Sequence, residues 1–377
     1  MEENTEDRPG PGGKRTAAAL AAVLTVMCLI LVYFYWRGII PGGDDGDADV
    51  VDLPDWYVPP SGSAETPDWM LDMTLVSDLQ EDGYNGSGIV VGIVDTGIDD
   101  SHPEFADDAI LLWKDFVNSR PEPYDDGGHG TAMASIIVAS GSLRGIAQGV
   151  RLIIAKAIPG EGGGNDATVG AAISWCADPN GDGDISDGAD IISLSLGGGE
   201  HPRFGSEAGT AARQAIDRGI IVVASAGNDG ELDDGDVESP ASEELVIAVG
   251  AIDSTGTIAS FSSVGDNDGR TPQTWDDRLD PNKKPEVVAP GVGITAAFPD
   301  GRYASVSGTS PAAAFVSGTL ALILQANPGY MRTGNSSAVI ALKTAMMQTA
   351  EPMDSQDTPH DSHYGYGLIQ AFRISFP

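Results

Sequence analysis

The sequence predicts an α/β domain with a mainly parallel sheet and helices on both of its faces, preceded by one transmembrane helix. Two observations predict the domain. Short runs rich in Val and Ile are bounded by glycine, and they alternate with longer segments of small and apolar residues. Such alternation is typical of parallel sheets, whose crossover helices bury both faces. A third observation, an uncharged run near the N-terminus, predicts the membrane helix.

The bulk composition allows an enzyme and argues against one class of partner. The 377 residues include 56 acidic and 20 basic side chains, for a formal net charge of -36. Nucleic acid is excluded as a partner, because phosphate binding needs clustered Lys and Arg. Two explanations of the charge remain open: a heavily hydrated surface suited to high salt, or carboxylate-rich loops that hold divalent cations. Cys28 and Cys176 lie in different parts of the chain, so we expect no internal disulfide.

The N-terminal segment predicts a single-pass membrane protein. Residues 16–36 read TAAALAAVLTVMCLILVYFYW, and about 20 uncharged residues suffice to cross a bilayer as a helix. Arg8, Lys14 and Arg15 precede this run, and aspartates follow it. The positive-inside rule therefore predicts that residues 1–15 form a cytoplasmic tail and that the remainder lies outside the cell membrane.

A cleaved signal peptide is the alternative for this segment. It would have a shorter apolar region and a cleavage site of small residues, whereas residues 33–36 are an aromatic cluster typical of a membrane interface. Residues 37–65 are rich in Pro, Gly and Asp, which predicts an extended stalk. The globular domain then occupies residues 66–377.

The globular part contains five predicted strands and five predicted helices. The strands are β-branched runs bounded by glycine or polar residues: Ile89–Asp95, Arg151–Ile158, Asp190–Leu196, Ile220–Ser225 and Leu245–Ala251. The helices are longer segments of small and apolar residues: Thr131–Ala139, Asp166–Ala177, Ser206–Arg218, Pro311–Gln325 and Ser337–Gln348. Some of these helices are apolar all round, so we expect them to be buried.

Three polar residues stand where a parallel sheet presents its functional groups, which is at the carboxyl ends of its strands. Asp95 closes the first strand, His129 stands in a glycine-flanked entry to a helix, and Ser310 lies in a glycine turn before another helix. Each has a structural explanation when taken alone: a turn aspartate, a satisfied histidine or an N-cap serine. Together they supply what nucleophilic catalysis needs, because a serine requires a base and the base requires a carboxylate that fixes its tautomer.

The segments around these residues resemble the blocks of the subtilase family. The matching blocks run in family order from Gly88 to Ala371: VVGIVDTGIDDSHPEF, GGHGTAMAS, SLSLGGG, VVASAGNDG, VIAVGAIDSTGTIASFSSVG, VVAPGVGI, SVSGTSPAAAFVSG and YGYGLIQA. The resemblance implies a seven-stranded parallel sheet and a serine endopeptidase that acts on polypeptides and needs no cofactor for catalysis. It implies that Ser310 is the nucleophile, His129 the general base and Asp95 its orienting carboxylate. Asn228 would donate its amide to the oxyanion.

The chain departs from the family pattern at three positions. Pro311 follows the nucleophile where the family most often has Met. Proline suits the first position of a helix, whose N–H has no partner in the helix. Phe315 and Met133 stand where the family commonly places His. We expect these three changes to alter packing and leave the chemistry intact.

The resemblance also implies a groove that binds substrate as an extended strand. Its edges would be formed by residues with small side chains or none: Gly162, Gly163, Gly164, Ser195, Leu196, Gly197, Ala226 and Gly227. The alternative for the glycines is that they only make turns. Glu238 falls where the family places the bottom of its primary specificity pocket, and Asp229 falls near the rim. Carboxylates there would favour Lys or Arg before the cut bond.

One loop predicts a metal site. Asp178, Asn180, Asp182 and Asp184 have the spacing of the first half of an EF-hand loop. The twelfth position of the loop is Ala189 and not an acidic residue, so the match is incomplete. We expect a single structural calcium loop; the alternative is a solvated acidic loop.

Partners and alternative functions follow from the same features. The stalk is too short for a folding pro-domain, so either folding needs no helper or a separate chain acts as folding helper or inhibitor. A non-catalytic peptide receptor or an adhesion module would explain the groove or the anchor. Neither would need Asp95, His129, Asn228 and Ser310 together.

Overall fold

The computed structural model describes residues 64–198, 206–230, 236–269, 271, 276–354 and 356–376. The predicted cytoplasmic tail, the transmembrane helix at 16–36 and nearly all of the stalk lie outside these residues. Among the described residues, one helix, Thr309–Ala326, is long and apolar enough to cross a membrane. Because 89% of its apolar window is buried inside the protein, it serves as a core helix.

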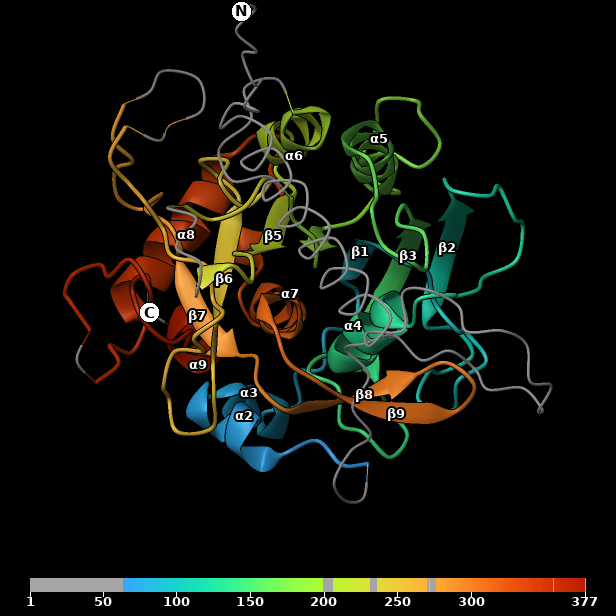
Figure 1. Ribbon diagram of the computed structural model, residues 1–377, viewed down its shortest axis with the longest axis horizontal. Coiled ribbons are helices and arrows are strands. Elements are labelled where there is room, and N and C mark those ends of the chain that lie inside the picture. Colours follow the sequence, from blue (N-terminus) through green and yellow to red (C-terminus); the bar gives the residue numbers. More distant parts are fainter. Residues whose placement is uncertain are drawn as a thin grey trace, which may run out of the picture. The chain divides into compact units, whose positions relative to one another are not determined.

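The domain is built on a seven-stranded sheet in which every neighbouring pair is parallel (Figure 1). In spatial order the strands are β2 (Ile110–Asp115), β3 (Arg151–Lys156), β1 (Val90–Asp95), β4 (Ile191–Leu194), β5 (Ile221–Ser225), β6 (Ile247–Ile252) and β7 (Val287–Pro290). The fold class, the seven strands and the five predicted strand positions are confirmed, with boundaries within two residues.

The two strands that we did not predict are the two edges of the sheet. β2 is partly exposed along most of its length and contains a lysine, so it lacks the apolar run of a central strand. β7 has only four residues and ends in Pro290, which cannot donate to a ladder. Edge strands therefore have weaker sequence signals than central ones.

Helices cover both faces of the sheet. Figure 1 shows α5 (Asp166–Ala177) and α6 (Glu207–Asp217) on one side, and α4 (His129–Val138) and α7 (Thr309–Ala326) on the other. The remaining helices are α2 (Asp68–Met73), α3 (Val76–Glu81), the 3₁₀ helix Pro328–Tyr330, α8 (Ser337–Thr349) and α9 (Ala371–Ser375). All five predicted helices are present, with boundaries within two residues.

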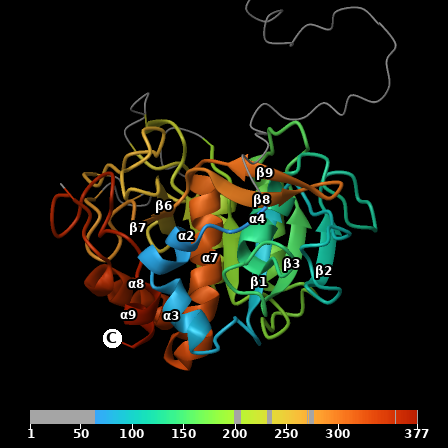
Figure 2. The ribbon, with the colours of Figure 1, turned by 90° about the horizontal axis from the view of Figure 1, so that it is seen from below.

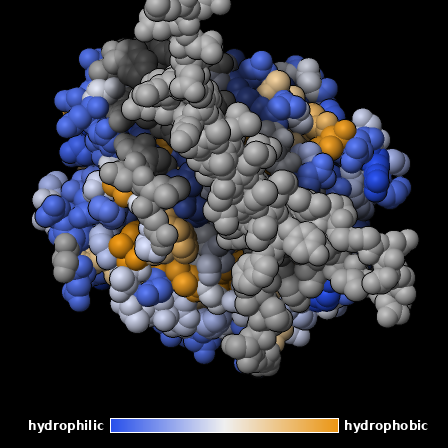
Figure 3. Space-filling view, in the orientation of Figure 1, coloured by the Kyte–Doolittle hydropathy of each residue, from blue (hydrophilic) through white to orange (hydrophobic). Residues whose placement is uncertain are grey.

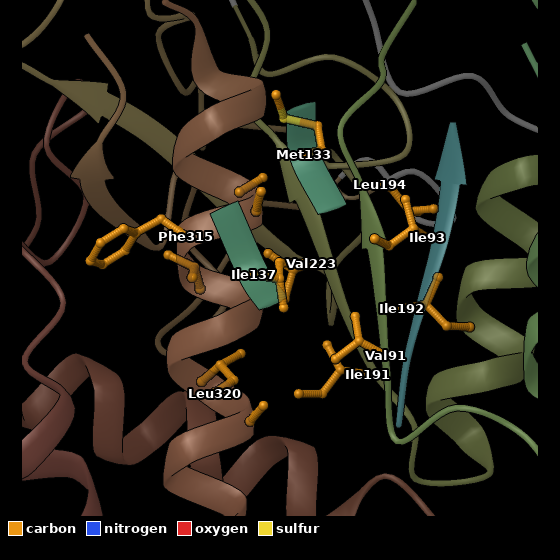
Figure 4. Packing of buried hydrophobic residues seen from close by; sticks show 14 of the residues in the cluster. Val91, Ile93, Met133, Ile137, Ile191, Ile192, Leu194, Val223, Phe315 and Leu320 are labelled. Atoms are coloured by element: carbon orange, nitrogen blue, oxygen red, sulfur yellow. The ribbon is translucent and has the colours of Figure 1, made fainter. Parts of the chain in front are cut away.

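Helix α7 is the centre of the core. Its side chains are buried all round and pack against β4, β5, β6 and β7 and against α4. Figure 4 labels Phe315 and Leu320 on this helix and Met133 on α4, and the Phe315 ring points away from the labelled side chains of β1 and β4. Phe315 and Met133 are both buried, so their expected packing role is confirmed.

A small antiparallel hairpin precedes α7. Its strands are β8 (Ile294–Phe298) and β9 (Arg302–Val306). Figure 2 shows the hairpin beside the N-terminal end of α7, and β8 also contacts α4. The hairpin thus lies next to the two helices that carry His129 and Ser310.

The described surface is mostly polar on the face seen in Figure 3. Apolar residues gather in a few patches between hydrophilic areas. This distribution agrees with the net charge of -36.

Candidate active site

Three elements bring the predicted catalytic residues to the carboxyl edge of the sheet. Asp95 is the last residue of β1, and His129 is the first residue of α4. Ser310 is the second residue of α7. Helix α4 therefore begins two residues before the predicted Thr131, which places the imidazole on the helix itself.

Asp95 and His129 are directly bonded. The Nδ1 atom of His129 lies 2.8 Å from Oδ1 of Asp95. The carboxyl side chain is 2% exposed, whereas the imidazole is 27% exposed. A carboxylate at Nδ1 fixes the tautomer that carries hydrogen on this nitrogen, so Nε2 is the nitrogen that can take up a proton.

Two opposing effects set the pKa of His129. Burial by itself lowers the pKa, because it disfavours the charged imidazolium. The charge of Asp95, its hydrogen bond and the charge of Asp125 together outweigh burial and raise the pKa above 6.5. The surrounding carboxylates thus stabilise the protonated form that a general base must pass through.

Asp125 positions this pair, although we did not predict it. Its carboxylate accepts hydrogen bonds both from the turn after β1 and from the start of α4. The donors are Thr96 Oγ1 at 2.8 Å, Gly127 N at 3.1 Å, Gly128 N at 2.7 Å, Thr131 N at 2.8 Å and Thr131 Oγ1 at 2.7 Å. The Asp125 carboxylate therefore connects the turn after β1, the strand of Asp95, to the start of α4, the helix of His129. An acidic residue shortly before a helix is a common capping signal, so the sequence contained a hint.

Gly128 is required at the position just before His129. Its φ is +78°, and an added Cβ would lie 2.3 Å from the Phe298 ring of the β8–β9 hairpin. A side chain at this position would push either the ring or the histidine away. The glycine-flanked histidine of the sequence is thus explained by a close approach.

Ser310 is tied to the strand edge that was predicted for substrate. Its Oγ donates to the Ser195 carbonyl at 3.1 Å, and Ser195 Oγ donates to the Ser310 carbonyl at 3.1 Å. Pro311 is the third residue of α7 and not the first, as we had expected. Its missing N–H still falls within the first turn, where backbone donors have no partner inside the helix. The helix therefore tolerates Pro311 directly after Ser310.

Asn228 is held by Thr309, which we did not predict as a site residue. The backbone N–H and the hydroxyl of Thr309 both donate to Oδ1 of Asn228, at 2.9 and 3.1 Å. A backbone N–H can only donate, so this end of the amide is the oxygen. The Nδ2 group is left as the end of Asn228 that can donate to an oxyanion.

The residues predicted for the specificity pocket are brought together. Glu238 donates its N–H to the Ala226 carbonyl at 2.8 Å. A Cβ added to Gly197 would lie 2.0 Å from Glu238 Oε2, and one added to Gly227 would lie 2.7 Å from Glu238 Cγ. The Glu238 side chain therefore lies between two glycine segments, and both glycines are needed for it to fit.

The predicted edge at Gly162, Gly163 and Gly164 lies in the loop after β3. Gly162 and Gly163 have φ values of +84° and +75°, and a Cβ at either would meet no atom within 4 Å. These two glycines thus serve as turn residues. Their role in binding substrate stays a prediction.

The predicted calcium loop is organised by its own backbone. Asp178 accepts from Gly181 N and Gly183 N, Asn180 from Asp182 N, Asp182 from Asp184 N, and Asp184 from Ser186 N. No group of three or more His, Cys, Asp or Glu side chains that could hold a metal occurs within the described part of the chain. Calcium binding at this loop stays a prediction.

Two arginines also hold this loop. Arg218 donates to the Gly183 carbonyl at 2.7 Å and lies 3.6 Å from Asp178 Oδ2. Arg332 donates to the Ile185 carbonyl at 2.5 Å. The loop is therefore contacted by the guanidinium groups of Arg218 and Arg332.

Comparisons with known proteins agree with this geometry. Residues 86–367 match the family model described as the subtilase family. The chain is 34% identical to subtilisin DY of Bacillus licheniformis over 314 residues, which are 81% of this chain and 97% of that protein. It is 35% identical to the subtilisin of Bacillus pumilus, over 77% of this chain and 92% of that protein. It is also 35% identical to subtilisin E of Bacillus subtilis (strain 168), of which the match covers 66%.

Proposed function

The chain belongs to the subtilase family and is a serine endopeptidase, and from this premise we propose that Ser310, His129 and Asp95 form its catalytic triad. The observation that carries the proposal is the 2.8 Å contact between His129 Nδ1 and Asp95 Oδ1. This contact lies at the edge of the sheet to which α7 brings Ser310 and to which β5 brings Asn228.

The proposed reaction proceeds through an acyl-enzyme. Ser310 Oγ attacks the scissile carbonyl while His129 Nε2 accepts its proton, and the imidazolium then protonates the leaving amine. Asp95 stays ionised and stabilises the imidazolium. Asn228 Nδ2 and the Ser310 N–H, which lies in the first turn of α7, donate to the oxyanion. Water, activated by His129, releases the acyl group.

Variants of the three residues test the triad. Ser310→Ala or His129→Ala should lower kcat for peptide hydrolysis by about 10⁵–10⁶, and Asp95→Asn by about 10⁴. Double variants should lose no more than the single ones, since the three groups act as a unit. A folded Ser310→Ala variant that retained activity would assign the nucleophile elsewhere.

We further propose that the enzyme prefers Lys or Arg before the cut bond. The Glu238 carboxylate supports this, because it lies against the glycine backbones at 197 and 227 that the family uses to line its primary pocket. A carboxylate there pairs well with a guanidinium or ammonium group. A peptide library tests the preference, with Glu238→Gln and Asp229→Asn as variants, of which the first should weaken the preference more. Cleavage mainly after Leu or Phe would contradict it.

We also propose that the enzyme is a single-pass membrane protein with its catalytic domain outside the cytoplasm. The support is the sequence alone: the uncharged run at 16–36, the basic residues before it and the stalk after it. Fractionation of cells tests this proposal. The full chain should sediment with membranes and be exposed to external protease, and a chain that lacks residues 1–36 should not sediment.

We also propose, from the sequence alone, that a separate protein helps this enzyme to fold or inhibits it. The support is the shortness of the predicted stalk, residues 37–65, between the predicted membrane helix and the catalytic domain. Refolding of the purified chain with and without lysate from the source organism tests it. Full activity after unassisted refolding would remove the need for a helper.

A further inference from the structure

Glu238 lies within a short segment that is held in place by hydrogen bonds to neighbouring parts of the fold. This specificity segment runs from Asp236 to Ser242, and Glu238 donates its N–H to the Ala226 carbonyl at 2.8 Å. The Ser242 N–H donates to the Glu238 carbonyl at 2.9 Å. The first contact thus connects the segment to Ala226 and the second lies within the segment, but neither contact joins Asp236 to Ser242.

Arg278 makes that connection. Its guanidinium donates to both carboxylate oxygens of Asp236, at 2.8 and 3.0 Å. It also donates to the Ser242 carbonyl at 2.9 Å and to the Asp266 carbonyl at 2.7 Å. One planar group therefore joins the first and last residues of the specificity segment, a geometry that suits Arg and that Lys cannot reproduce.

The contact is deeply buried. The side chains of Arg278 and Asp236 are both 0% exposed. A buried ion pair is costly to break, because removal of one partner leaves an uncompensated charge. The position of the specificity segment is thus coupled to the formation of this pair.

Arg278 comes from a different part of the chain than the catalytic residues. It lies in the connection between β6 and β7, where its N–H donates to the Asn267 carbonyl at 2.8 Å. Asn267 in turn bonds Lys284 through its side chain, at 2.7 and 3.1 Å. No hydrogen bond recorded for the described residues joins Arg278 to Asp95, His129 or Ser310. We therefore expect its effect at the specificity segment, which it contacts directly.

We propose that Arg278 is a positioning residue for primary specificity: by clamping Asp236 to Ser242 it holds the Glu238 carboxylate over the glycines at 197 and 227. The inference rests on the proposed role of Glu238 in substrate preference. Without the hydrogen bonds of Arg278 to Asp236 and Ser242, the specificity segment can shift. The enzyme then discriminates less between side chains before the cut bond, while the rate of the chemical step stays unchanged.

The test measures kcat and KM of the full chain on two peptides that differ only in having Arg or Leu before the cut bond. Arg278→Lys keeps the positive charge and removes the bidentate contact of the guanidinium with Asp236. The ratio of kcat/KM for the Arg peptide to that for the Leu peptide should fall about tenfold, mainly through KM for the Arg peptide. Asp236→Asn, which loses the same pair from the other side, should shift the ratio in the same direction.

Arg332→Lys is the matched control. Arg332 is also an arginine that lies 3.3 Å from an aspartate, Asp190, and donates to loop carbonyls. Arg332 lies between the 3₁₀ helix Pro328–Tyr330 and α8, and Asp190 directly precedes β4. The pair therefore lies at the amino ends of the strands, whereas Ser310 lies at their carboxyl ends. This variant should lower the melting temperature and leave the Arg-to-Leu ratio unchanged.

The outcomes separate the two proposals. A wild-type enzyme without preference for Arg, together with an inert Glu238→Gln, would overturn the basic specificity alone. The clamp would then still be supported if Arg278→Lys changed the ratios among other peptides and Arg332→Lys did not. Equal losses on all peptides in both Arg278→Lys and Asp236→Asn would overturn the positioning role.

Discussion

Thr309 donates two hydrogen bonds to a single atom of Asn228, from its N–H at 2.9 Å and from its hydroxyl at 3.1 Å to Oδ1. The hydroxyl also bonds the backbone of Gly227. Thr309, which directly precedes the proposed nucleophile, therefore fixes the orientation of the Asn228 side-chain amide. This contact connects α7 with the loop after β5 and couples the two halves of the proposed oxyanion site.

Removal of the Thr309 hydroxyl should lower kcat without much change in KM. We expect Thr309→Val to lose about tenfold in kcat and Asn228→Ala about 10²–10³, because the second change removes the oxyanion donor itself. Thr309→Ser keeps the hydroxyl and should stay near the wild type. Steady-state kinetics on one peptide measures all three. A folded Thr309→Val enzyme with wild-type kcat would show that the contact does not matter for catalysis.

The acid limb of the pH profile of kcat/KM should lie above pH 6.5. The base must be neutral, and carboxylates raise the pKa of His129, so acidification inactivates the enzyme at a higher pH than for a free histidine. Asp125→Asn removes one of these charges and should move the limb of kcat/KM to lower pH. Measurements at constant ionic strength keep screening equal. An acid limb that stayed in place or moved to higher pH would contradict the assignment of part of the pKa shift to Asp125.

The stability of the fold should rise between pH 7 and pH 10 because of Lys284. Burial lowers the pKa of this lysine to about 7, although Glu286 opposes the shift. In this range the unfolded chain binds more protons than the folded one, so the free energy of unfolding increases with pH, by at most about 1.4 kcal/mol per pH unit. Lys284→Met should have a flatter profile in urea titrations, and Glu286 would keep Lys343 at 2.8 Å. Parallel profiles for the two proteins would contradict this assignment.

Calcium should raise the melting temperature if the loop of Asp178 and Asp182 binds it. Binding to the folded state alone stabilises by mass action. We expect dialysis into EDTA to lower the melting temperature and calcium to restore it, with the response lost in Asp182→Asn. A melting temperature insensitive to EDTA would leave Arg218 and Arg332 as the groups that hold the loop.

The proposed catalytic residues could be identified in the sequence because each stands in a local block whose spacing is visible in the chain. Thr309, which orients Asn228, and Arg278, which holds the segment of Glu238, could not be predicted, since their partners are distant in sequence. Thr309 and Asn228 are 81 positions apart, and Arg278 and Asp236 are 42 apart. The central strands were predicted from their buried Val and Ile, whereas β2 and β7 had weaker signals as edges. The sequence suggested a basic pocket from Glu238, but only the fold revealed what holds that residue in place.

Labelling by a fluorophosphonate probe tests the central claim most directly, because such probes react with a serine that a nearby base activates. The full-length chain, its Ser310→Ala variant and its His129→Ala variant would be compared, with folding verified by circular dichroism. We expect the wild type to be labelled at Ser310, Ser310→Ala to remain unlabelled and His129→Ala to be labelled far more slowly. A folded wild type that resists the probe, or a Ser310→Ala variant that is still labelled, would contradict it.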